Sequence, residues 1–472
     1  MISLEQATEQ IKKANPVFGG FLDSEDTLND YVKTQLTNYV AHPIHKARQK
    51  TYVEAIQREV ARLFPKGEVN VNFNEELILD TTDHHNVLNF PATIGAHILS
   101  RFDTLLDRQG HGDFFVLDTG NVPFTEILHK RGIELGGKHI NLYPKKDRNK
   151  LTSHYPMHKF EFVKSALNSE EKFTEDEMAF LKKMDELVNG IDISNCRDFS
   201  DQIVKINLAL WLEMFGSDVR EDVRRCVTLE HNHILRHYLP KFLLEQRDNF
   251  VWRALFDPDF RQLIMKEFTG IYGAWDYSGP KTGTHFFWGI TPGGEQTPLF
   301  LDGDVLKDPS GQVEDTPLTP EGIAAALEKN IIAPSIFTKF GLVAFYLGAK
   351  VMGGPGQTEY VPKLKETWLK ILRQTDPEEA KLVSLVPGDA MNTFDLAFNK
   401  TPDGKIFKQW GFDMVKNHTL SRTYLEQLKN LPLRAALKSF IPLAYYRLTA
   451  ANDRQEVDCQ EQDLYSGFGW VK

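Results

Sequence analysis

The sequence has few cysteines and no long apolar run. Its three cysteines, Cys196, Cys226 and Cys459, show no CxxC spacing, which favours a reducing compartment and argues against a disulfide framework. No apolar stretch reaches about 18 residues, so we expect no membrane-spanning helix. The N-terminal stretch MISLEQATEQIKKANPVF lacks the apolar centre of a signal peptide, and we therefore expect a cytoplasmic protein.

An excess of basic residues is also missing. Asp and Glu outnumber Lys and Arg by 65 to 55, which gives a formal net charge of −10. Nucleic acids and anionic membranes are bound by basic faces, so this balance argues against both as partners. A small anionic substrate in a local basic groove remains compatible with it. At 472 residues, the chain is long enough for two or three domains or one large elaborated domain.

The apolar pattern alternates between helical and strand-like stretches, without an internal repeat. Residues 1–68 show helical spacing. Residues 69–159 alternate, with strand-like EVNVNFNEELILD, helical PATIGAHILSRFDTLLDRQ, and strand-like DFFVLDTG and HINLYP. Strand, helix and strand at this spacing form a βαβ unit, which predicts a parallel, doubly wound sheet.

The rest of the sequence predicts which helices and strands are added to this core. Residues 160–268 are almost wholly helical in pattern, and residues 373–472 are mostly helical. Strand character returns within 269–372 at THFFWGIT, TPLFLDG and GLVAFYLGAKVM. We therefore predict an α/β protein with a Rossmann-like parallel-sheet core, a large helical insertion and helical terminal segments. The long helices are also compatible with a homodimer.

The most polar loop of the predicted core follows its first strand. The apolar run ends at Asp80, and Asp83, His84, His85 and Asn86 follow. Loops at the carboxyl ends of parallel strands face the ligand crevice of such folds. Histidines there transfer protons near neutral pH or bind a metal. We predict Asp83, His84 and His85 as catalytic residues and Asn86 as a substrate ligand. The alternative is a turn stabilised by Asp and Asn, with exposed histidines.

The second predicted strand ends in a similar way. Asp118 closes the run FFVLD, and Asn121 lies in the turn that follows. We predict a catalytic role for Asp118 and substrate binding for Asn121. Arg131, in the sequence KRG, offers a bidentate fork that would hold the acidic end of a substrate together with Lys281. An ordinary exposed turn explains KRG equally well.

A histidine-rich segment, TLEHNHILRHYLPKF, spans residues 228–242. On a helix, Glu230, His233 and His237 share one face, and Glu-x-x-His pairs begin the metal sites of some helical proteins. A metal needs three or four converging ligands, however, and one helix usually supplies two. Buried polar or interface histidines, His231 among them, are the favoured interpretation, with a metal site as the alternative.

Two glycine-rich turns are further candidates for a ligand crevice, although the sequence does not show whether they meet the polar loops in one site. The segment GGPGQTEY lies between a predicted strand and a helix, and GPKTGTHFFWG precedes another strand. Glycines let backbone N–H groups approach an anionic or carbonyl ligand closely. Neither turn has the spacing of a dinucleotide fingerprint or a Walker loop, and simple tight turns are the alternative. The predicted substrate-binding residues here are Lys281, His285, Gly353, Gly354, Gly356, Gln357 and Tyr360.

The segment IIAPSIFTKFGLVAFYLGAKVMGGPGQTEYVPKLK resembles part of the bacillithiol-synthesis cysteine-adding enzymes, a family of putative cysteine ligases. In that family, an Arg-Pro-x-x-Gln turn precedes an apolar run and a Gly-Gly-Pro-Gly-Glu-x-x-Tyr signature. Pro334 matches the proline, while Ala333 replaces the arginine and Gln357 the glutamate. The similarity extends in patches over residues 70–145 and 270–370. It implies a Rossmann-like core with helical additions and bond formation between a carbonyl centre and an amine.

Three functions follow as hypotheses. The first is a ligase or transferase that joins an amino acid or another amine to a carboxylate- or sugar-derived acceptor, with His84 or His85 as general base held by Asp83. The second is a metal-dependent hydrolase with Asp80, Asp83, His84 and His85 as ligands. The third is a non-catalytic helical scaffold or effector. The cofactor is left open, and a nucleotide and a metal are both compatible with the sequence.

Overall fold

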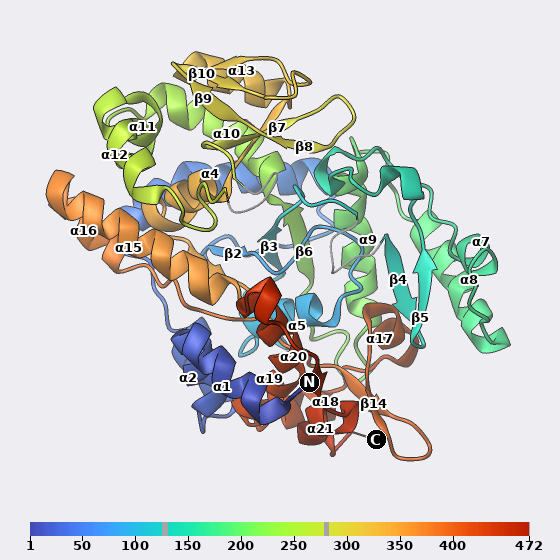
Figure 1. The fold of residues 1–472 in the computed structure, drawn as a ribbon. Coiled ribbons are helices and arrows are strands. Elements are labelled where there is room, and N and C mark those ends of the chain that lie inside the picture. Colours follow the sequence, from blue (N-terminus) through green and yellow to red (C-terminus); the bar gives the residue numbers. More distant parts are fainter. Residues whose placement is uncertain (125–130, 278–282, 472) are drawn as a thin grey trace.

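The computed structural model describes residues 1–124, 131–277 and 283–471 (Figure 1). At its centre lies a parallel sheet of four strands in the order β13-β2-β3-β6. The strands are β2 (Ile78–Asp80), β3 (Phe114–Asp118), β6 (Cys226–Glu230) and β13 (Lys350–Met352). The predicted α/β class with a parallel-sheet core is therefore confirmed.

The sheet is covered on both faces, because every residue of its four strands is buried. One face, which includes Ile78 and Val116, packs on α5 (Pro91–Ser100), α9 (Phe199–Glu213) and the C-terminal helices. The other face, which includes Leu79 and Leu117, packs on α4 (Pro43–Leu63), α10 (His231–Glu245) and α15 (Gln357–Thr375). Alternation along each strand thus divides the protein into two hydrophobic cores.

Three of the four strands end in a carboxylate. Asp80 ends β2, Asp118 ends β3 and Glu230 ends β6, and Asp118 pairs directly with Glu230 in the register. Because the strands are parallel, all three acidic side chains lie at the same edge of the sheet.

The segment 160–268 is mostly helical, as predicted, but it also contributes β6 to the sheet. Its other helices are α7 (Phe162–Leu167), α8 (Glu175–Asn189), α11 (Phe250–Phe256) and α12 (Pro258–Phe268). The sequence CVTLE is short and leads directly into the histidine-rich helix. A short apolar run beside a helix cannot be distinguished from the helix by periodicity.

Several strand-like stretches lie outside the parallel sheet. THFFWGIT and TPLFLDG form antiparallel strands, and HINLYP gives β5 (Lys138–Asn141), which pairs with β4 (Gly132–Leu135). The antiparallel strands are β7 (Phe287–Ile290) and β8 (Gln296–Pro298) with β12 (Ile332–Pro334), and β9 (Phe300–Asp302) and β10 (Val305–Lys307) with β11 (Thr316–Pro317).

The apolar run GLVAFYLGAKVM differs most from the prediction. It was expected as a strand, yet its first half lies in the π-helix η4 (Phe340–Tyr346), which continues α14 (Ile336–Lys339). Only Lys350–Met352 is extended. Every residue of η4 is buried, so the run has no polar face that would reveal helical periodicity.

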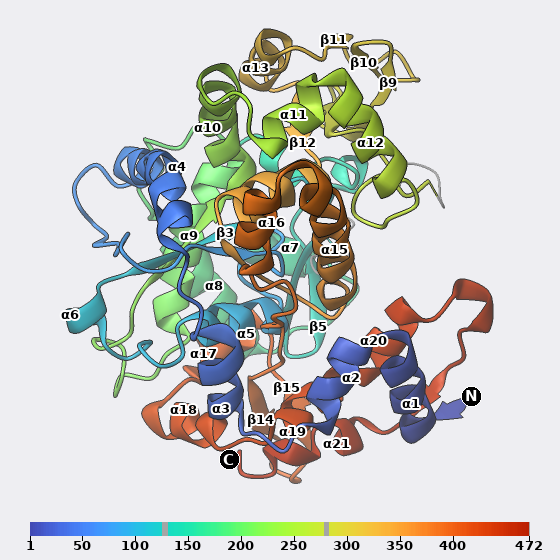
Figure 2. The same ribbon diagram turned by 90° about the vertical axis from the view of Figure 1, so that its left-hand side faces the viewer.

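The N-terminal helices and the C-terminal region lie side by side (Figures 1 and 2). β1 (Ile2–Ser3) pairs in parallel with β16 (Val457–Asp458), and α1 (Leu4–Ala14) packs against α20 (Ile441–Leu448). The remaining elements are α2 (Pro16–Asp23), α3 (Leu28–Tyr31), η1 (Val32–Leu36), α6 (Arg108–His111), η2 (Lys145–Asp147), η3 (Thr152–His154), α13 (Pro320–Glu328), α16 (Pro377–Ser384), β14 (Phe398–Lys400), β15 (Ile406–Lys408), α17 (Gly411–Asn417), α18 (Arg422–Lys429), α19 (Leu433–Leu437), η5 (Lys438–Phe440), η6 (Ala451–Asp453), α21 (Glu461–Leu464) and η7 (Ser466–Phe468). Across the described ranges, no helix has both the length and the apolar character needed to cross a membrane.

Candidate functional site

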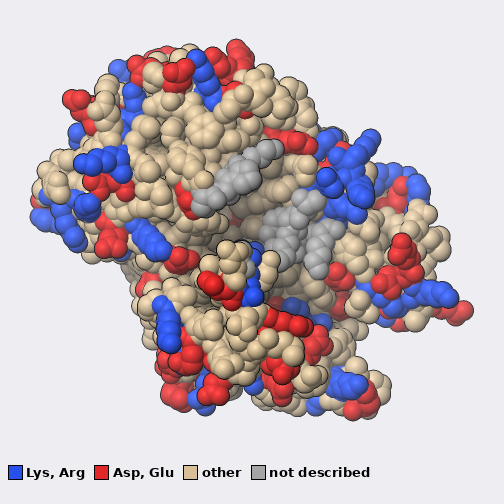
Figure 3. All heavy atoms as spheres, in the orientation of Figure 1, with Lys and Arg blue, Asp and Glu red and all other residues tan. Residues whose placement is uncertain are grey.

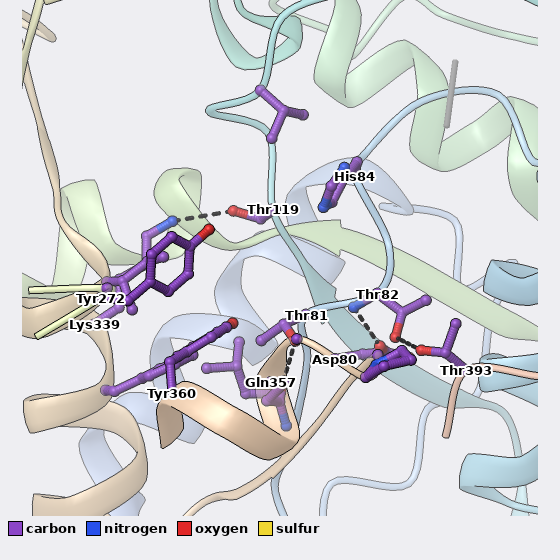
Figure 4. Close-up of a pocket in the computed structure, with 18 of the residues that line it drawn as sticks. Asp80, Thr81, Thr82, His84, Thr119, Tyr272, Lys339, Gln357, Tyr360 and Thr393 are labelled. Atoms are coloured by element: carbon purple, nitrogen blue, oxygen red, sulfur yellow. Dashed lines mark hydrogen bonds between the residues drawn. The ribbon is translucent and has the colours of Figure 1, made fainter. Parts of the chain in front are cut away.

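A cavity of about 530 Å³ opens at the carboxyl edge of the parallel sheet. The loops after β2 and β3, the start of α10, the glycine-rich turn before α15, the α14–η4 helix and α20 all contribute to its wall. Figure 3 shows the surface hollowed at the centre of the molecule, and Figure 4 shows the cavity in detail. This volume and position suit a small-molecule ligand.

The structure brings seven of the residues predicted as catalytic, substrate-binding or alternative metal ligands to the cavity wall. They come from three separate parts of the chain, so the polar loop after β2 and the glycine-rich turn do meet at one site. These residues are Asp80, His84, Asn121, Gly354, Gly356, Gln357 and Tyr360.

His85 and Asp118, both predicted to be catalytic, lie beneath the cavity wall as a buried pair. Their Nδ1 and Oδ2 atoms are 2.7 Å apart, and neither side chain is exposed. The other ring nitrogen of His85 donates to the backbone oxygen of Ser200 at 3.0 Å. Burial alone would lower the pKa of His85, but the charge and hydrogen bond of Asp118 raise it to about 9. The pair therefore joins the loop after β2 to β3 and α9.

Asp83 is also buried, and it pairs with a histidine that the sequence analysis did not select. His97 of α5 lies 2.8 Å from Asp83 Oδ2 through Nε2 and 3.3 Å from Asp80 Oδ2 through Nδ1. Burial opposes a charge on this imidazole, but hydrogen bonds to both carboxylates raise its pKa to about 10. An imidazolium thus lies between the two carboxylates, and Asp80 extends from this group to the cavity wall.

Three other residues predicted to bind the substrate form their contacts outside the cavity. Asn86 accepts a hydrogen bond from Tyr143 at 2.7 Å, and Arg131 donates to the backbone oxygen of Tyr143 at 2.9 Å. His285 accepts from the backbone N–H of Leu301. None of these three predicted ligands is part of the cavity wall, and Lys281 lies outside the described residues.

Gly353 has a packing role. A Cβ atom at this position would collide with the side chains of Thr81 and Gln357, which fill the space beside it. Figure 4 shows Thr81 and Gln357 in contact at the floor of the cavity. A Cβ atom at Gly356 would meet open space and one at Gly354 would make an ordinary contact with Thr393, and both glycines line the cavity. Packing therefore requires glycine at position 353, whereas Gly354 and Gly356 border the space available to a ligand.

Lys339 is the most unusual residue in the wall. It is only 6% exposed, and its Nζ donates to Asn121 Oδ1 at 3.0 Å and to Thr119 Oγ1 at 3.3 Å (Figure 4). Both acceptors are neutral, and within the described part of the chain no carboxylate forms an ion pair with Lys339. Burial lowers its pKa to about 8, against the opposing effect of the Glu230 charge.

Aromatic rings form one side of the cavity. Tyr360 stacks on Phe340 with a centroid distance of 6.0 Å and an interplanar angle of 6°, and Tyr272 lies 5.5 Å from Tyr360. In Figure 4, Tyr272 and Tyr360 lie on the side opposite His84 and Thr82. Arg447 of α20 contributes a second cation to the wall.

Two residues of the histidine-rich segment, Glu230 and His233, have structural roles. Glu230 caps α10, because its carboxylate accepts from the backbone N–H groups of Asn232 and His233. His233 lies 3.2 Å from Asp198 and 3.5 Å from Asp201, and these carboxylates outweigh burial and raise its pKa to about 9.

Within residues 1–124, 131–277 and 283–471, one group of three potential metal ligands has its atoms within 4.8 Å of one another: Glu59, Asp201 and His233. Arg62 and Arg197 already pair with both carboxylates. Two guanidinium groups therefore occupy the place of a cation. The loop set proposed from the sequence as an alternative metal site does not form such a group.

No family model matches this chain, and no curated protein is similar to it in sequence. The resemblance to the cysteine-adding enzymes therefore stays a prediction.

Proposed function

We propose that the protein is an enzyme of ligase or transferase type, which binds an anionic small molecule in the cavity and joins an amine to a carboxylate- or sugar-derived acceptor. One observation carries the proposal: a buried ammonium group, that of Lys339, in the wall of a ligand-sized cavity and without a described carboxylate partner.

An isolated buried charge costs several kcal/mol unless it is paired. Asn121 and Thr119 supply hydrogen bonds to Lys339 but no opposite charge, and the Glu230 charge acts on it without forming an ion pair. An anionic substrate would supply that charge. Buried titratable groups in a cleft with shifted pKa values are also more frequent in catalytic sites than in structural ones.

The cavity also contains groups suited to a bond-forming step at a carbonyl centre. Lys339, with a pKa of about 8, is mostly protonated at neutral pH and can stabilise a developing oxyanion. Gly354 and Gly356 border the cavity at the start of α15, where helix N–H groups favour negative charge. Tyr272 and Tyr360 provide two aromatic rings, tilted against each other, for contact with the body of the substrate.

The experiment is a thermal-shift screen of the standard amino acids, dicarboxylates and sugar phosphates, each with and without ATP. Amino acids that stabilise the protein are then incubated with stabilising acceptors, and the products are analysed by mass spectrometry. A ligand present at 100 times its dissociation constant stabilises a protein by about 2.7 kcal/mol, which such a screen detects.

The matched variants are Lys339→Met and Lys350→Met. Lys350 is also buried with a pKa of about 8, but its Nζ donates to the backbone oxygens of Gln35 and Leu36 away from the cavity. We expect stabilisation and product formation in the wild type and in Lys350→Met, and neither in Lys339→Met. If no compound binds, or if binding is equal in Lys339→Met, the proposal is wrong.

A further inference from the structure

His231 shares the cavity with Lys339, and the sequence analysis gave it no catalytic role. It is the first residue of α10, it is only 1% exposed, and its side chain forms part of the cavity wall. Its Nε2 atom is buried without a hydrogen-bond partner among the described residues. Buried polar atoms without a partner are rare and costly, and a ligand or an ordered water would satisfy this one.

We propose that His231 is the general base of the reaction and that Lys339 is the cationic group that acts with it. The inference rests on the function proposed above and assigns two roles within the same cavity. His231 removes the proton from the attacking amine, and the Lys339 ammonium stabilises the oxygen on which negative charge develops.

The electrostatics of the cavity support this division of roles. Burial, together with the nearby charge of Lys339, lowers the pKa of His231 well below its usual value, so its imidazole is neutral at physiological pH. Lys339 keeps its proton under the same conditions, since its pKa is about 8. Groups in one site whose pKa values are driven apart are the expected acid and base.

The groups packed around His231 do not change this assignment. The ring of Tyr52 on α4 meets it edge-on at 6.3 Å, and the pKa of this phenol is raised well above 10 by burial. The adjacent Glu230 carboxylate is already engaged by backbone N–H groups of Gly120, Asn232 and His233.

The reaction class that fits is transfer of an acyl group from an ester, a thioester or an acyl phosphate to an amine. The amine nitrogen bonds to the carbonyl carbon as His231 takes one of its protons, and the carbonyl electron pair moves to the oxygen beside Lys339. When the carbonyl re-forms, the bond to the leaving group breaks, and the proton held by His231 neutralises that group. An amide and the free leaving group are the products.

The first test is NMR of protein labelled with [13C]histidine, with His231→Gln to assign the signal. We expect the His231 ring to be neutral in the wild type at pH 6.5, where an ordinary imidazole is half protonated. Its titration should move to higher pH in Lys339→Met but not in Lys350→Met, because only Lys339 places its charge in the cavity. A charged His231 at pH 7, or a titration that Lys339→Met does not move, would overturn the inference.

The second test uses the substrate pair found in the screen and compares His231→Gln with His237→Gln. His237 lies on the same helix but does not border the cavity, so it controls for the loss of an imidazole from α10. We expect kcat of His231→Gln to fall about 100-fold or more with KM nearly unchanged, and His237→Gln to resemble the wild type.

The two proposals fail in different ways. If product forms at the wild-type rate in His231→Gln, the role of His231 is overturned while the proposed function stands. If no ligand binds and no product forms, both are overturned. Equal circular dichroism spectra of all variants establish that each one folds.

Discussion

His85 and Asp118 form a buried pair, 2.7 Å apart, that ties the loop after β2 to the end of β3. The two residues were predicted as catalytic, yet neither reaches the cavity. Their position indicates that they hold the polar loop in place, so that Asp80 and His84 reach the ligand side while Asp83 and His85 stay beneath it.

We predict that His85→Ala lowers the free energy of unfolding by about 3–5 kcal/mol, because it leaves the Asp118 carboxylate buried without its partner. Urea denaturation followed by tryptophan fluorescence measures this change. The matched control is His139→Ala, which removes a partly exposed pair with Glu134 and should cost less than about 1 kcal/mol. Equal losses in the two variants would show that the buried pair has no special structural role.

A second prediction concerns pH and His97. The pKa of this imidazole is about 10 in the folded protein, above its ordinary value of 6.5, so folding increases proton binding. The resulting stabilisation is complete below about pH 6.5 and is lost as pH rises through about 10. The free energy of unfolding should therefore fall over this range, and it should fall less in His97→Gln. Identical pH profiles of the two proteins, measured by urea denaturation, would contradict this origin.

The sequence was sufficient to predict the class of fold and one edge of the site. Apolar runs that end in Asp80 and Asp118 identified two neighbouring parallel strands, and GGPG was identified as a turn between a strand and a helix. These features are local: a run of buried residues, a terminal carboxylate and a turn. The common edge of the loops after β2 and β3 followed from the rule that parallel strands share a carboxyl edge, but the sequence did not show that the glycine-rich turn lies beside them.

Residues whose role depends on tertiary contacts were not predicted. His97 lies in the apolar segment PATIGAHIL, where a single histidine has the pattern of a core residue. Only the tertiary structure shows that Asp80 and Asp83 lie on either side of its ring. Lys339 is the single charged residue in the apolar segment IFTKFGLVAFY, and a lone charge in such a segment is the feature of the sequence that indicates a functional residue. It was overlooked because the run was interpreted as a strand instead of a helix.

A third prediction compares alanine substitutions at two glycines of the turn before α15. Gly353→Ala should lower both thermal stability and ligand affinity, because a methyl group there must displace Thr81 or Gln357. Overpacking of this kind costs about 1–3 kcal/mol. Gly356→Ala places its methyl group in open space and should change the melting temperature little. Differential scanning calorimetry compares the two, and equal melting temperatures would show that the turn adapts to either methyl group.

The last prediction is that Lys339→Met makes the protein more stable as it removes the function. The folded-state pKa of Lys339, about 8, lies below the ordinary value of 10.5, so folding releases a proton between these limits and the charged form is penalised.

This shift corresponds to at most about 3 kcal/mol at pH 7, less the hydrogen bonds to Asn121 and Thr119. The methionine variant should thus exceed the wild type in unfolding free energy at pH 7, and the difference should shrink as pH rises toward about 10.5. A variant that is less stable at pH 7 would mean that Lys339 has a structural role. A gain in stability combined with loss of ligand binding is the pattern of a residue kept for function at a cost to folding.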